Sequence, residues 1–64
     1  MPHITVELIE GRTVEQKRKL VEGITHVVVD ALKVPAEAVS ISLHDKKRED
    51  LAKAGKLYID LPGK

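Results

Sequence analysis

Pro2 directly follows Met1, so removal of the methionine leaves the proline nitrogen as a secondary amine. A general base is most effective when its pKa lies near the ambient pH. Partial desolvation beside positive charges lowers the pKa of an amine toward that range. The pyrrolidine ring also fixes the nitrogen relative to the following chain. These properties make Pro2 suited to proton-transfer chemistry, on condition that Met1 is removed, although a proline after the initiator methionine is common and is usually not catalytic.

Arg12 is the second residue suited to such chemistry. Its guanidinium stays charged and offers a planar fork that matches a carboxylate. It can hold an anionic substrate and stabilise the enolate charge that develops as a proton leaves carbon. We expect neither a metal nor an organic cofactor for this enolisation. The three histidines, His3, His26 and His44, are also too scattered for a short metal-binding motif. His3 and His44 fall on strands predicted to be neighbours, where we expect a surface or interface pair.

The hydrophobic pattern predicts the elements that position these residues. Apolar and polar residues alternate over 2–9, which indicates a strand with one buried face. Thr13 and Gln16 form a capping box that starts a helix, and Pro35 prevents its continuation. We expect residues 16–19 on the outer face of this helix. Spacings of three and four give it a wide apolar stripe, formed by Leu20, Ile24, Val27, Val28, Ala31 and Leu32.

A second alternating stretch, 39–44, predicts a strand that pairs in parallel with the first. Residues 45–50 are almost all charged and read as a loop. The segment 51–64 reads as a turn or short hairpin followed by an extended tail that Pro62 and Gly63 close. The predicted architecture is a single α+β domain over residues 1–64, built as a β-α-β unit. Its two strands and one helix leave apolar surface uncovered, so we expect protomers to associate.

Pro2, the alternating strand and the Glu-Gly-Arg-Thr-x-Glu-Gln-Lys motif of residues 10–17 closely resemble the 4-oxalocrotonate tautomerase family. The resemblance covers the whole chain and implies the tautomerase-like fold. It also implies a cofactor-independent isomerase that interconverts keto and enol forms of 2-hydroxydienoate or 2-oxo acids by 1,3- or 1,5-proton shifts. In such a protein Pro2 is the general base and acid. Arg12 then contacts the substrate's carboxylate or carbonyl oxygen from a neighbouring subunit. Members of the family are homo- or hetero-oligomers, most often hexamers built as trimers of dimers, and we expect a homo-oligomer.

The same resemblance implies substrate contacts at Ile9, Ser40 and Leu51. Ser40 stands where many members carry a second arginine, and a hydroxyl cannot supply that charge. Leu51 replaces an aromatic residue and keeps the wall apolar. An altered or weaker activity is therefore expected. The charged run 46–48 offers a substitute cation, although such a run is usually solvated.

Composition excludes several other classes of function. The chain has 64 residues, a net charge of +1, no cysteine and one aromatic residue, Tyr58. Neither nucleic-acid binding nor disulfide stabilisation is indicated, and no apolar run is long enough to span a bilayer. With no secretory signal visible, we expect a cytoplasmic protein. The alternative is a non-catalytic assembly or ligand-binding protein with the same fold. Ser40 and the presence of Met1 both favour that alternative.

Overall fold

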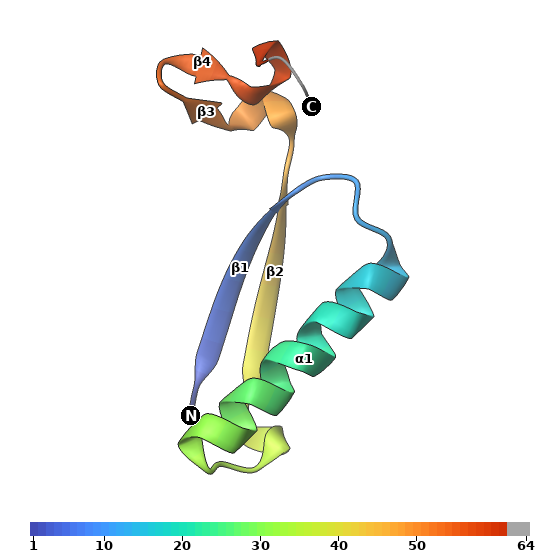
Figure 1. Cartoon of the computed structure of the whole chain (residues 1–64), viewed down its shortest axis with the longest axis vertical. Helices are drawn as coiled ribbons and strands as arrows, with labels where there is room; N and C mark the ends of the chain where they lie inside the picture. Colours follow the sequence, from blue (N-terminus) through green and yellow to red (C-terminus); the bar gives the residue numbers. More distant parts are fainter. Residues whose placement is uncertain (62–64) are drawn as a thin grey trace.

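The computed structural model describes residues 1–61, which form a β-α-β unit followed by a short hairpin (Figure 1). The α+β class and the element order predicted from the sequence are confirmed. The predicted Pro62-Gly63 end lies outside the described residues. In chain order the elements are β1 (His3–Ile9), α1 (Val14–Leu32), a 3₁₀ turn (Ala36–Ala38), β2 (Ser40–Lys46), a 3₁₀ turn (Arg48–Asp50), β3 (Ala52–Lys53), β4 (Lys56–Leu57) and a 3₁₀ turn (Tyr58–Asp60).

β1 and β2 pair in parallel, as predicted, with His3 opposite Ser40 and Ile9 opposite Lys46. The second strand starts one residue later and ends two residues later than expected. It continues because β1 still offers partners, and the Glu10 amide donates to the Lys46 carbonyl oxygen at 2.9 Å. The prediction that the loop begins at residue 45 was therefore wrong. Charged side chains at an exposed strand end do not prevent backbone pairing.

The capping box at the start of α1 is confirmed. The Gln16 amide donates to the Thr13 hydroxyl at 3.1 Å, and the Thr13 amide donates to the Gln16 side-chain oxygen at 2.9 Å. These bonds satisfy two amides that have no partner inside the helix. At the other end, Lys33 takes a left-handed conformation with φ 59° and its amide donates to the Val29 carbonyl. Thr13 and Lys33 thus fix both ends of the helix.

The helix lies across the β1–β2 pair (Figure 1). Only part of its apolar stripe is covered. Leu20 and Ile24 are half-buried, whereas Val27 is 64% exposed and Leu32 is 57% exposed. The expectation that residues 16–19 all lie on the outer face was wrong for Lys17. Its ammonium instead reaches across to β2, as described below.

The C-terminal hairpin extends past the end of β2 and away from α1 (Figure 1). Its turn places Ala54 and Gly55 at positive φ, 55° and 83°. Two hydrogen bonds close the segment on itself. The Tyr58 amide donates to the Leu51 carbonyl at 2.8 Å, and the Arg48 guanidinium donates to the Tyr58 carbonyl at 3.1 Å. The predicted hairpin is confirmed, although a 3₁₀ turn at Arg48–Asp50 replaces part of the predicted loop. The prediction that the hairpin is followed by an extended tail was wrong at Tyr58–Asp60, which form another 3₁₀ turn.

No residue in 1–61 is fully buried. The radius of gyration is 14.9 Å, against about 11 Å expected for a globular chain of this length. The accessible surface is 5030 Å², against about 4,100 Å² for a typical folded monomer of this mass. The fold is elongated, with extents of 43 × 24 × 16 Å. A chain of this shape leaves much of its apolar surface for other chains to cover.

Candidate active site

Pro2 and Ser40 lie together at the start of the parallel pair. The Ser40 amide donates to the Pro2 carbonyl at 3.1 Å, which extends the ladder by one bond. Pro2 is half-buried, while Met1 is 94% exposed. With Met1 attached, the Pro2 nitrogen is a tertiary amide that can neither donate nor accept a proton.

A hydrogen-bonded cluster, His3–Ser40–Ser42, stands next to Pro2. His3 Nδ1 lies 2.6 Å from Ser40 Oγ, and His3 Nε2 lies 3.1 Å from Ser42 Oγ. The expected pairing of His3 with His44 was wrong, because the parallel register sets His44 opposite Glu7. In the sequence, the only indication of this cluster is that both strands begin with a polar residue, His3 in β1 and Ser40 in β2. Only the register shows that these residues meet.

Arg12 lies at the opposite end of β1, in the turn before α1. Gly11 takes φ 116°, a conformation that favours glycine, as the chain turns from strand to helix. Arg12 is exposed and helps to line a cleft of about 260 Å³. Lys17 Nζ and Asp45 Oδ2, 2.7 Å apart, tie the helix to β2 beside this cleft. The sequence reasoning assigned no cleft role to the other lining residues, although Gln16 and Lys17 belong to the motif of residues 10–17 and Leu20 to the apolar stripe. The full lining is Leu8, Arg12, Gln16, Lys17 and Leu20.

The structure divides the predicted site residues between the two ends of the sheet. Pro2 and Ser40 are at one end, and Ile9 and Arg12 are at the other. The seven residues of β1 span about 20 Å at the usual rise of a strand. Leu51 lies beyond the far end of β2, on the hairpin side (Figure 1). One chain therefore does not bring Pro2 and Arg12 into contact with the same small substrate.

The charged run 46–48 does not supply a cation to Pro2 within this chain. Lys46 ends β2, opposite Ile9, and Arg48 donates to the Tyr58 carbonyl. Within residues 1–61, no three side chains of the metal-binding types gather to hold an ion. Over the same residues, no helix is long and apolar enough to cross a membrane.

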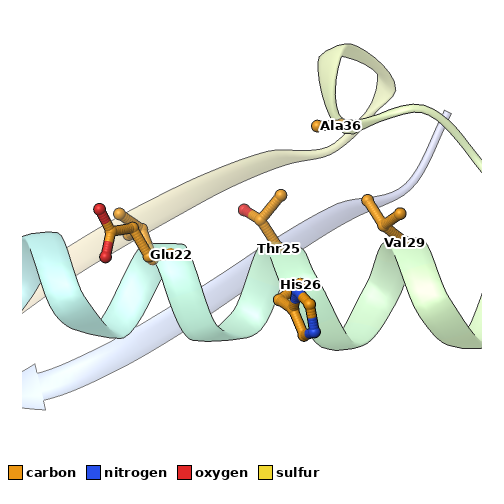
Figure 2. Close-up of a pocket in the computed structure, with 6 residues that line it drawn as sticks. Glu22, Thr25, His26, Val29 and Ala36 are labelled. Atoms are coloured by element: carbon orange, nitrogen blue, oxygen red, sulfur yellow. The ribbon is translucent and has the colours of Figure 1, made fainter.

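Two further hollows follow the flanks of α1. One, of about 420 Å³, lies between the helix and Ala36 (Figure 2). Thr25 and Val29 rise from the helix on the side of Ala36. The other, of about 470 Å³, includes Ile24 and Val27. Neither hollow includes Pro2 or Arg12. The second is lined by residues of the incompletely covered apolar stripe, whereas the first lies on the neighbouring flank of the helix.

Comparison with known proteins decides the family. The model of the family described as "Tautomerase enzyme" matches residues 2–60. The chain belongs to the tautomerase family. The 2-hydroxymuconate tautomerase of Bacillus subtilis is 38% identical over 61 residues, which covers 95% of this chain and 98% of the relative. A probable tautomerase of Listeria monocytogenes is 40% identical and covers 86% and 90% of the two chains.

Solved structures agree with this assignment. The crystal structure of YwhB, a homologue of 4-oxalocrotonate tautomerase, superposes with a TM-score of 0.90 at 37% identity. The match covers 94% of this tautomerase and 98% of YwhB. Family membership supports the reaction class, which is isomerisation by tautomerisation. The tautomerase-like fold that the motif implied is confirmed.

Proposed function

We propose that this tautomerase interconverts keto and enol forms of 2-hydroxydienoate or related 2-oxo acids without a cofactor. Pro2, freed by removal of Met1, is the general base and acid. The observation that carries the proposal is the position of Pro2, half-buried at the head of the parallel pair, where the family match also begins. A free amine there is fixed by its ring and by the strand that follows it.

The reaction moves one proton and one double bond. The neutral Pro2 amine takes the proton from the substrate's 2-hydroxyl group, and negative charge spreads over the dienolate. The ammonium form of Pro2 then returns the proton to a carbon of the dienolate, which yields the 2-oxo acid and restores the neutral amine. Each step needs a positive group near the developing charge.

Arg12 supplies that positive group from a second copy of the chain. The length of β1 separates Arg12 from Pro2 in one protomer, so a shared site needs two protomers. The elongated fold and the uncovered apolar flanks of α1 support association. We propose a homo-oligomer, a hexamer built as a trimer of dimers, in which each site joins Pro2 of one copy to Arg12 of another.

The remaining predicted contacts fit the same arrangement. Ile9 lies at the Arg12 end of β1, and Leu51 follows the same end of β2. Both present apolar side chains that would exclude water from the base. Ser40 lies at the Pro2 end and offers a hydroxyl instead of a charge. Ile9 and Leu51 therefore shape the pocket, while Ser40 contributes a hydrogen bond.

A non-catalytic ligand-binding or assembly protein is the second candidate. One observation favours it: position 40 has no guanidinium. If Met1 is retained in the cell, the fold keeps its surfaces but has no amine base.

Intact-mass spectrometry followed by a ketonisation assay separates the two candidates. The protein purified from its natural source should lack Met1 and should ketonise 2-hydroxymuconate or an enolised arylpyruvate. Pro2→Ala, also freed of Met1, should lose most of this activity. A form with Met1 retained is the matched control, because it keeps Pro2 but blocks its nitrogen. Equal rates for the processed wild type and Pro2→Ala would overturn the proposal.

A further inference from the structure

The His3–Ser40–Ser42 cluster adjoins the proposed base but has no role in the proton transfer described above. Side chains alternate across a strand, so His3 and Ser40 share one face of the sheet. Ile4 and Ile41, the next pair along, point to the helix side and are half-buried. The cluster therefore lies on the face opposite α1, at the same strand ends as Pro2.

We propose that protonated His3, acting through the hydroxyls of Ser40 and Ser42, binds a carboxylate of the substrate beside Pro2. This inference rests on the proposed function of Pro2. It assigns a substrate-binding role to His3 and Ser42, which carried no role in the tautomerase motif. It also gives Ser40 a positively charged partner.

The hydrogen-bond geometry supports this role. Both imidazole nitrogens already lie at hydrogen-bond distance from a serine oxygen, 2.6 Å and 3.1 Å away. A neutral imidazole has one donor and one acceptor, so one serine must direct its O–H at the ring. An imidazolium has two donors, so both serine oxygens accept and both O–H groups can turn outward. Protonation of His3 therefore creates a positive site with two outward donors, which suits a carboxylate.

The surrounding charges are compatible with an anion site. Glu7 and His44 share the face but lie four residues further along, about 13 Å away at the usual strand rise. The ion pair of Lys17 with Asp45 lies on the helix side. The free Pro2 amine adjoins His3 along the chain. Within residues 1–61, no carboxylate forms an ion pair with His3, so the ring is open to an external carboxylate.

The inference specifies the substrate class. A dicarboxylate can place one carboxylate on Arg12 of a neighbouring copy and the other on the cluster. A monocarboxylate can use only one of these sites. The preference for a dicarboxylate should therefore depend on the protonation of His3, and it should weaken as pH rises.

The test compares 2-hydroxymuconate, a dicarboxylate, with 2-hydroxypenta-2,4-dienoate, a monocarboxylate, from about pH 5.5 to about pH 8.5. In the wild type, the ratio of the two KM values should change across this range. His3→Gln should remove that change and raise the dicarboxylate KM about tenfold at low pH, with a smaller effect on kcat. Ser40→Ala should act in the same direction. His44→Gln, on the same face of β2, is the matched control and should behave as the wild type.

Two results would overturn the inference. One is a His3→Gln protein that keeps the wild-type pH dependence of the KM ratio. The other is an equal loss for both substrates at every pH, which indicates a structural role only. Circular dichroism and sedimentation identify a variant that fails to fold or assemble.

A binding measurement keeps this inference separate from the proposed function. If Pro2→Ala matches the wild-type rate, the proposed function fails, whatever His3 does. Carboxylate binding at the cluster is then measured by NMR with adipate, a non-reacting dicarboxylate. Adipate should shift the His3 ring resonances but not those of His44, and Ser40→Ala should weaken the shift. Unmoved His3 resonances would show that the cluster binds no carboxylate.

Discussion

The two ends of the β1–β2 pair differ in chemistry although one parallel ladder builds both. At one end, Pro2 and Ser40 belong to a network of short polar side chains held by hydrogen bonds. At the other, Arg12 is exposed beside an apolar cleft. The first end offers groups that exchange protons, and the second offers a fixed charge and apolar walls. Neither end alone meets the needs of an enolisation.

This division explains why a chain so small can support a catalytic site. In the proposed assembly, two protomers that approach with opposite ends together provide a base, a cation and a water-excluding wall. The isolated protomer provides only one of these sets at any point on its surface. Activity should therefore depend on contact between the two kinds of end, which the following variants test in order of expected effect.

Loss of the base should have the largest effect. Pro2→Ala keeps an amine after methionine removal but loses the ring that fixes the nitrogen. General acid–base groups contribute about 10²- to 10⁴-fold, and we expect kcat to fall within that range while KM changes little. Steady-state kinetics on 2-hydroxymuconate measure this. A fall in affinity alone would place the base elsewhere.

Loss of the cation should have the next largest effect. Arg12→Ala removes a charge-assisted contact, and kcat/KM should fall about 10- to 100-fold. Arg12→Lys should recover part of the loss, because it restores the charge but not the planar fork. An unchanged kcat/KM in Arg12→Ala would show that Arg12 does not bind the substrate.

Mixing these two variants tests the division directly. When Pro2→Ala and Arg12→Ala chains are unfolded and reassembled together, some sites receive Pro2 from one variant and Arg12 from the other. In a random mixture, about one quarter of the sites regain both groups. Activity well above the sum of the separate variants is the expected result. If each chain instead forms a complete site by itself, mixing the two variants restores no activity.

A charge on the uncovered helix flank should prevent the ends from meeting. Val27 is 64% exposed in the single chain, and burial of a valine in an interface contributes about 1.5–3 kcal/mol. Val27→Asp should therefore shift sedimentation toward smaller species and reduce activity in proportion. Asp30→Asn, an exposed position on the same helix, should leave both unchanged. A fully assembled Val27→Asp protein would show that this flank is not an interface.

Loss of the helix cap should have the smallest effect. Thr13→Ala removes the hydroxyl that accepts from the Gln16 amide, at a cost of about 1 kcal/mol. Because Thr13 follows Arg12, KM should rise slightly while kcat stays near the wild-type value. Thr13→Ser preserves the cap and should match the wild type. Thermal unfolding at one fixed protein concentration measures the stability change.

The local elements could be predicted from the sequence because their causes are local. The capping box and alternation at Ile4 and Val6 depend on neighbours a few residues away. The end of β2 could not be predicted, because it depends on how far β1 extends beside it. The orientation of Lys17 also depends on a partner in another element, Asp45.

The candidate site was predicted as a list of residues but not as an arrangement. Pro2 and Arg12 followed from a motif, yet their separation by β1 appears only in the fold. The cluster around His3 depends on a parallel register that sets residue 3 beside residue 40. A pattern in one chain also cannot specify contacts between chains, and the proposed site depends on such contacts.

The absence of a fully buried residue among 1–61 has a consequence for the protein's lifetime in the cell. In the proposed assembly, folding and association are coupled, so stability increases with concentration. Dilution should therefore shorten the protein's half-life as well as lower its activity, so a cell could control this enzyme by its expression level alone.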